Sequence, residues 1–408
     1  MPVSFRRSLL AAALPLGYAL QVDASMNTCP WIGFSLDFEQ SMCAYMELEA
    51  FADESGEYRR DSLEHNNWRT FPDCFDDYCV YTNDNFHGKG LSLITTASNH
   101  HRVKELQIPQ TALELGYEKT RIAEIPDKGR GLIATKTIRK GERILAAKPA
   151  LLVHRDAFRQ VAMQDMFYLM DLAVSNLPKA RRESYMGQAG SMGSHKITDI
   201  LFTNSFQVTL GGHDGFHYAN FPEVSVLNHD CRPNMAFFID GNLTHHTHAV
   251  RDISPGEELT ISYVDALQIR SERQERTRNS LGFSCTCSQC TLPKEELDAS
   301  DDRIRTISRI ERELSNVNSK EPSPAMIEEY IALYKTEGLD HNIAGAYTLA
   351  ALNYNFLGKA TLAKKCARLS AEAGRLENGP DAGDVREMTV LAEDPESHWS
   401  WKAKADRL

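Results

Sequence analysis

The chain has 408 residues, 42% hydrophobic and 25% charged, so it is long and apolar enough to form two or three globular domains. Its net charge of −11 at pH 7 excludes a protein that binds nucleic acid through a general basic surface. Beyond residue 25, no apolar run reaches the roughly twenty residues that a membrane-spanning helix needs, so we expect a soluble mature protein, and a monomer.

Residues 1–24 have the pattern of a secretory signal peptide. Arg6 and Arg7 precede a mostly apolar run, and the small residues that end at Ala24 have the spacing of a cleavage site. An amphipathic N-terminal helix, or a chain that starts at Met26, would explain the same residues. The pattern favours the signal peptide.

Residues 25–116 form a region rich in acidic and aromatic residues, without a periodic core of useful length. In an oxidising compartment its four cysteines would form two disulfides, with three possible pairings, whereas in the cytosol they would stay reduced. These cysteines are Cys29, Cys43, Cys74 and Cys79.

The segment 117–265 alternates short β-type runs with turns. The runs "TRIAEI", "ALLVH" and "ELTISYV" predict short strands. Apolar residues recur at helical spacing within 156–205, which predicts a helical insert in a β domain. The histidines of "LTHHTHAV" predict an exposed polar strand rather than a metal site, and "RSERQERTR" predicts a solvated helix.

From residue 293 to residue 408 the pattern is helical. Ser323 and Pro324 are typical of a helix start and Gly338 of a helix end. The spacing of small residues and tyrosines around Gly358 is loosely that of a tetratricopeptide unit. Cys366 falls on an apolar stripe, which predicts a core position.

The run "FSCTCSQC" has the spacing of a metal site, because short C-x-C and C-x-x-C loops bring thiolates close together. Zinc prefers four ligands, and Cys231 is the nearest unused thiol that could complete the set. A disulfide plus a free thiol, or three unrelated buried cysteines, are the alternatives. The proposed ligands are Cys231, Cys285, Cys287 and Cys290.

Two further motifs contain candidate binding-site residues, which are glycines in one and a tyrosine in the other. In "DKGRGL", Gly129 and Gly131 let the backbone approach a ligand closely, whereas the similar "HGKGL" at residues 87–91 is interpreted as a fortuitous turn. In "GEELTISY", Tyr263 ends a predicted strand, where its phenol can project into a cleft bordered by Asn228.

Taken in order, "GRGL", "NHDCRPN", "GEELTISY" and "FSCTCSQC" resemble the SET-domain protein lysine methyltransferases over roughly residues 117–292. The similarity extends to the SET-and-MYND group, although no MYND finger is expected because residues 156–205 contain no cysteine. The resemblance implies an α+β fold: a SET domain of small sheets at 117–265, a post-SET zinc segment at 266–292 and a C-terminal helical domain at 293–408.

The resemblance also implies S-adenosylmethionine as methyl donor, Zn²⁺ in the post-SET segment and a protein lysine, histone or non-histone, as acceptor. Tyr263 would be the active-site phenol and would orient the amine and the methyl group. The residues that the resemblance assigns to the cofactor are Gly129, Arg130, Gly131, Asn228, His229, Tyr263 and Phe283.

Some features depart from the family's pattern. Asp230 stands where the family often has serine, and Val226 and Leu227 stand where it often has an arginine. The alternative is a catalytically inactive SET scaffold that binds peptides, secreted or not. The signal-like leader indicates the secretory pathway and SET chemistry the nucleus or cytoplasm, so the sequence leaves the localisation open.

Overall fold

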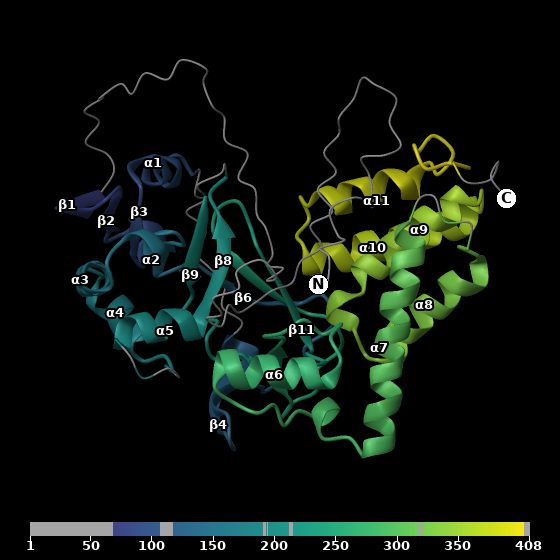
Figure 1. Ribbon diagram of the computed structural model, residues 1–408, viewed down its shortest axis with the longest axis horizontal. Coiled ribbons are helices and arrows are strands. Elements are labelled where there is room, and N and C mark those ends of the chain that lie inside the picture. The colour runs from purple at the N-terminus through teal and green to yellow at the C-terminus, as the bar shows by residue number, and fades with distance from the viewer. Residues whose placement is uncertain are drawn as a thin grey trace.

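The computed structural model describes residues 68–106, 117–190, 193, 195–211, 215–316, 319 and 321–403. Three sheets with their insert helices occupy the left of Figure 1, and helices α7 to α11 gather on the right. The predicted α+β class, with small sheets and a C-terminal helical region, is confirmed. The predicted signal peptide, Cys29 and Cys43 lie outside the described residues.

The largest sheet joins the first described strands to strands more than fifty residues later. β3 pairs in parallel with β7, so residues that precede 117 contribute to the same sheet as residues 151–220. A disulfide between Cys74 and Cys79 links β1 to β2, and helix α1 (Ala97–Glu105) follows β3. The sheet has the order β1 (Trp68–Phe75), β2 (Tyr78–Asn83), β3 (Leu91–Thr95), β7 (Leu151–His154), β9 (Phe216–Asn220) and β8 (Ser205–Thr209).

Helices fill the segment where an insert was predicted. Met166, Leu169, Met170 and Ala173 lie at i, i+3, i+4 and i+7 and are buried, with α3 packed on β2 and β3. The amphipathic stripe therefore covers one face of the large sheet. The four helices are α2 (Ala157–Gln160), α3 (Met163–Ser175), α4 (Lys179–Met186) and α5 (Lys196–Asn204).

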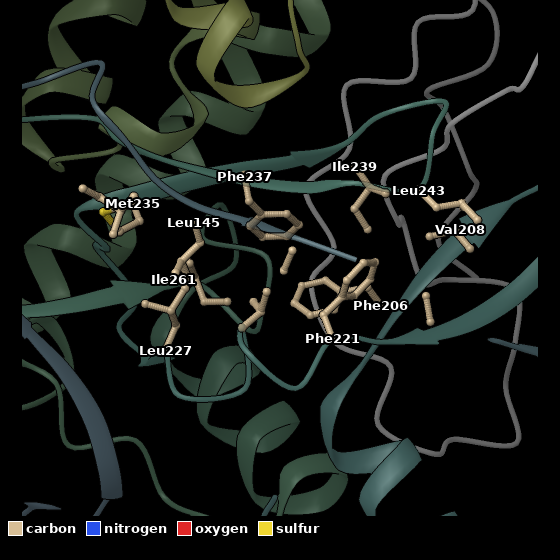
Figure 2. Packing of buried hydrophobic residues seen from close by; sticks show 14 of the residues in the cluster. Leu145, Phe206, Val208, Phe221, Leu227, Met235, Phe237, Ile239, Leu243 and Ile261 are labelled. Atoms are coloured by element: carbon tan, nitrogen blue, oxygen red, sulfur yellow. The ribbon is translucent and has the colours of Figure 1, made fainter. Parts of the chain in front are cut away.

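Two smaller sheets form the middle of the molecule. Along β11, Met235, Phe237 and Ile239 point into the core shown in Figure 2, where the Phe237 ring meets Phe206 at 5.2 Å. One sheet has the order β10 (Asn228–His229), β13 (Glu258–Ile261), β5 (Gly129–Ala134) and β4 (Thr120–Ile125). The other has the order β11 (Met235–Ile239), β12 (His245–Ala249) and β6 (Arg143–Ala147).

Asn234 holds the segment between β10 and β11 against β13. Its side-chain amide donates to the Glu258 carbonyl at 2.8 Å and accepts from the Thr260 N–H at 2.9 Å. β10 also pairs in parallel with β13, with His229 opposite Ile261. The short β10 segment is therefore fixed from both ends, and the residues next to it have defined positions.

The C-terminal region is helical, as predicted. The Ser323 side chain caps the start of α8, and Gly338 follows its end with a φ of 64°. Cys366 is buried in the helical core, as expected, while the tetratricopeptide-like relationship stays a prediction. The helices are α6 (Arg270–Leu281), α7 (Lys294–Ser315), α8 (Pro324–Thr336), α9 (Ala344–Phe356), α10 (Ala360–Glu377) and α11 (Gly383–Glu393). Single 3₁₀ turns are η1 (Phe86–Gly88), η2 (Tyr117–Lys119), η3 (Ser288–Cys290) and η4 (Asp340–Asn342).

A buried carboxylate joins the helical region to the SET-like part. The side chain of Glu337 has no exposed surface, and it accepts from Arg232 and Arg303 at 2.6 Å and from Ser300 at 2.8 Å. Arg232 directly follows Cys231, so this ion-pair network ties α7 and the end of α8 to the segment after β10. In the described part of the chain, no helix is both long and apolar enough to cross a bilayer.

Candidate active site and metal centre

The four central cysteines converge, as the sequence predicted. Cys231 follows β10, and the other three lie between α6 and α7. Their sulfur atoms all lie within 4.8 Å of one another, with Cys231 Sγ 3.6 Å from Cys290 Sγ and 3.9 Å from Cys285 Sγ. A tetrahedral Zn²⁺ with bonds of about 2.3 Å needs sulfur separations of about 3.8 Å. The geometry therefore fits one tetrahedral metal ion.

Arg273 gives independent support for negative charge on this cluster. Its side chain is completely buried, its Nε has no hydrogen-bond partner, and no carboxylate among the described residues forms an ion pair with it. Burial alone would lower the pKa of Arg273, but the Cys231 and Cys290 sulfurs raise it above its ordinary value. A buried guanidinium needs a counter-charge, and the cysteine sulfurs would provide it as thiolates bound to a metal ion.

Helix α6 also holds the backbone of the cysteine loop. Gln274 Nε2 donates to the Cys285 carbonyl at 2.6 Å, and Arg270 Nε donates to the Cys290 carbonyl at 2.9 Å. The expectation of a solvated helix is therefore wrong for the face of α6 that carries Arg273 and Gln274, because both are buried against the cluster.

His229 connects the cluster to Tyr263. Its Nδ1 accepts from the Tyr263 backbone N–H at 3.0 Å, so the neutral ring carries its proton on Nε2, which lies 3.3 Å from Cys231 Sγ. Burial lowers the pKa of His229 to about 4, which keeps the ring neutral at pH 7. Both ring nitrogens thus have partners inside the protein, so the His229 ring has no nitrogen left to bond a ligand.

The Tyr263 phenol lies at the end of β13, where the sequence placed it. Its hydroxyl donates to the Leu227 carbonyl at 2.5 Å, and its ring lies 6.4 Å from the half-buried Phe283 ring. Burial, with a smaller effect of the Glu258 carboxylate, raises the pKa of Tyr263. The phenol therefore stays protonated at neutral pH and is suited to hydrogen bonding rather than to proton abstraction.

Strand β5 approaches the side chains of Asn228 and Glu258 closely at Gly131, so any larger residue there would have to displace them. A Cβ atom on Gly131 would lie 2.5 Å from Ile125 Cγ1, 2.8 Å from Glu258 Oε1 and 2.9 Å from Asn228 Nδ2. Gly129 is permissive for a different reason, since its φ is 73° and the space around it is open. Packing therefore favours glycine at position 131, and backbone geometry favours it at position 129.

The structure brings most of the predicted site residues together. Phe283 packs beside the cysteine cluster, 6.0 Å from the His229 ring, and Asn228 lies against β5 through its bond to the Arg130 carbonyl. The Arg130 guanidinium instead extends to the Gly187 carbonyl at 2.6 Å. Arg130 therefore borders the site through its backbone.

Three residues of this site carried no signal in the sequence analysis. Glu258 accepts from Asn228 Nδ2 at 2.8 Å and from Lys128 Nζ at 2.9 Å, and Arg273 is buried beside the thiols. Lys128 and Glu258 lie inside the motifs "DKGRGL" and "GEELTISY", and Arg273 lies inside "RSERQERTR". The sequence of a turn, a strand start or a basic helix does not show which of its charged residues is buried.

Comparisons with known proteins agree with this geometry. The SET domain family model matches residues 129–264. The chain is 26% identical over 298 residues to histone-lysine N-methyltransferase set5 of Schizosaccharomyces pombe, and the alignment covers 68% of this chain and 85% of that protein. It is 36% identical over 127 residues to N-lysine methyltransferase SMYD2-B of Danio rerio, which covers 30% of this chain and 29% of that protein.

A third relative, N-lysine methyltransferase SMYD2 of Homo sapiens, is 39% identical over 90 residues, or 22% of this chain and 20% of that protein. The chain thus spans less than a third of the SMYD2 relatives but most of the yeast relative. Fold and family match agree on a SET domain over residues 129–264. The predicted resemblance to SET-domain protein lysine methyltransferases related to the SMYD group is confirmed.

Proposed function

We propose that this chain transfers a methyl group from S-adenosylmethionine to a lysine side chain of a protein. The observation that carries the proposal is that the Tyr263 hydroxyl bonds the carbonyl of Leu227, the residue before Asn228, while the Phe283 ring lies 6.4 Å from the Tyr263 ring beside the cysteine cluster. An amide, a protonated phenol and an aromatic ring are suited to binding an amino-acid group, an amine and a purine.

In this proposal the protein mainly aligns the reactants. The cofactor, when bound, would supply an electrophilic methyl group. The protein would hold the neutral lysine nitrogen in line with the methyl carbon–sulfur bond, so that this bond breaks as the nitrogen–carbon bond forms and the thioether leaves. The Tyr263 hydroxyl donates to Leu227, and a phenol oxygen also accepts, so it would orient an N–H of the amine. An apolar, buried surrounding disfavours the ammonium form of lysine, whose ordinary pKa is about 10.4.

The remaining residues would bind the cofactor and the metal. Phe283 would pack on the adenine, Asn228 and the His229 backbone would contact the amino-acid and adenosine parts, and Gly129 to Gly131 would line the cofactor with their backbone. A four-cysteine Zn²⁺ site has no open position for catalysis, so its role would be to fix the Phe283 segment against β10.

The proposal assigns these roles to segments of the chain. Residues 117–265 would form the SET domain with its insert at 156–205, residues 266–292 the post-SET zinc segment, and residues 293–408 a helical domain that forms one wall of the substrate cleft. The contacts of Glu337 with Arg232 support this arrangement, because they fix the helical region beside the cysteine cluster.

The test is methyl transfer by the zinc-loaded protein. Tritiated S-adenosylmethionine is supplied with core histones and, separately, with a protein extract, and labelled residues are identified by mass spectrometry. We expect label on lysine, and a loss of about 100-fold or more in Tyr263→Phe with cofactor affinity nearly unchanged, because only alignment of the amine is lost. Cofactor binding without transfer to any lysine would favour the inactive-scaffold alternative.

A further inference from the structure

The amide of Asn228 is held in one orientation. Its Nδ2 donates to the Arg130 carbonyl at 3.1 Å and to Glu258 Oε1 at 2.8 Å. A backbone carbonyl and a carboxylate accept hydrogen bonds and donate none, so the NH₂ end must face both of them. The Oδ1 atom is consequently turned away from Arg130 and Glu258.

The carboxylate that fixes this amide is itself fixed. Glu258 Oε2 accepts from Lys128 Nζ at 2.9 Å, and the Glu258 side chain is only 17% exposed. Lys128 lies in the turn between β4 and β5, whereas Glu258 begins β13. Glu258 therefore links the turn before Gly129 to the strand that ends near Tyr263, with Asn228 between them.

The packing of β5 supports this arrangement independently. The bare backbone at Gly131 is what allows β5 to lie against Glu258 Oε1 and Asn228 Nδ2, since a Cβ atom there would be 2.8 and 2.9 Å from them. The hydrogen bond between Asn228 and Glu258 is thus enclosed by a strand that has no side chain at the point of contact.

We propose that Glu258, held by Lys128, is a positioning residue that fixes the Asn228 amide so that its Oδ1 is offered to the ammonium group of the methionine part of S-adenosylmethionine. This inference rests on the proposed function. If the amide turned over, Oδ1 would face the Glu258 carboxylate, and two acceptors would repel each other. The carboxylate therefore selects the orientation in which Asn228 accepts from the ligand.

Glu258→Gln tests this inference, because glutamine has nearly the same side-chain shape as glutamate but no charge. A glutamine presents an oxygen or an NH₂ group to Asn228, so either orientation of the Asn228 amide becomes possible. A hydrogen bond to a charged group contributes about 1.5 kcal/mol or more, which corresponds to about tenfold in affinity. We expect the loss only for ligands that carry the ammonium group.

The experiment compares two probes by calorimetric titration of the zinc-loaded full chain. S-adenosylhomocysteine has the amino-acid group, and 5′-methylthioadenosine lacks it. In Glu258→Gln we expect S-adenosylhomocysteine to bind about tenfold more weakly and 5′-methylthioadenosine to bind as in the wild type. The matched control is Glu257→Gln, because Glu257 is the neighbouring residue and forms an exposed ion pair with Arg251.

Lys128→Gln is a second variant, which leaves the Glu258 carboxylate in place. We expect it to lower the affinity for S-adenosylhomocysteine by less than Glu258→Gln does, and to leave the affinity for 5′-methylthioadenosine unchanged. If Glu258→Gln lost equal affinity for both probes, or lost affinity for neither, the proposed role of Glu258 would be overturned. If the wild-type protein bound neither probe, the proposed function itself would fail. A selectivity between two probes separates positioning from general damage to the fold, because a fold defect weakens both.

Discussion

Arg273 offers a test of the metal centre, because its substitution should have a larger effect with metal than without it. Four thiolates and one Zn²⁺ carry a net charge of −2, and Arg273 is a completely buried cation that interacts with Cys231 and Cys290. Without metal the pKa values of Cys231 and Cys285 are raised, so these two are neutral thiols and the same guanidinium faces less negative charge. Arg273→Met should therefore destabilise the zinc-bound protein more than the metal-free protein, and so weaken zinc binding.

The magnitude follows from the charges. One unit charge about 5 Å from the opposite charge contributes about 3 kcal/mol at an effective dielectric constant of about 20, which corresponds to roughly 100-fold in zinc affinity. Truncating one partner of a buried charge pair costs about 3–5 kcal/mol, which agrees with this value. The metal-free protein bears a smaller cost because Cys231 and Cys285 are then neutral thiols.

The assay is competition for zinc with a chromophoric chelator, together with thermal unfolding of the reduced protein with and without zinc. Arg276→Met is the matched control, because Arg276 lies one turn further along α6 and is only half-buried. If Arg273→Met bound zinc as tightly as the wild type, the thiols would not be the counter-charge of Arg273, and the argument would be refuted.

Two further substitutions test the packing that surrounds the site. Gly131→Ala should abolish or strongly weaken cofactor binding, whereas Gly129→Ala should mainly lower the free energy of unfolding, by about 1 kcal/mol, because Gly129 has a positive φ. Calorimetry measures cofactor binding and chemical denaturation measures stability. Equal cofactor affinity in the two variants would contradict the packing argument. Glu337→Gln should lower the free energy of unfolding by about 3 kcal/mol, because Arg232 and Arg303 lose their buried partner. Denaturant unfolding measures this against the exposed Glu329→Gln, and equal stability of the two variants would argue against the ion-pair network.

The cysteine cluster was predictable because metal coordination imposes a count and a spacing. Three cysteines in "FSCTCSQC" leave one ligand position to fill, and this requirement selected Cys231 across 54 residues of chain. Tyr263 was placed correctly because a short strand defines where its end lies. In both cases a local pattern was enough to define the chemistry.

Burial of single charged or polar residues was not predictable in the same way. The strand with His245, His246 and His248 was expected to be exposed, yet His245 is completely buried and stacks on Phe237 at 4.8 Å. Arg273 likewise belongs to a helix of low hydropathy, and only its neighbours in space distinguish it from the solvated Arg278. Such positions depend on which elements pack together, and the sequence of one element does not contain that information.

The central claim, a working cofactor site, is tested most directly by calorimetric titration of S-adenosylmethionine into the zinc-loaded protein, with Asn228→Ala as the control. The account predicts saturable binding by the wild type that the control abolishes, because Asn228 contributes the amide that meets the cofactor's amino-acid group. Absence of binding by a folded, zinc-loaded protein, or unchanged binding by Asn228→Ala, would contradict it.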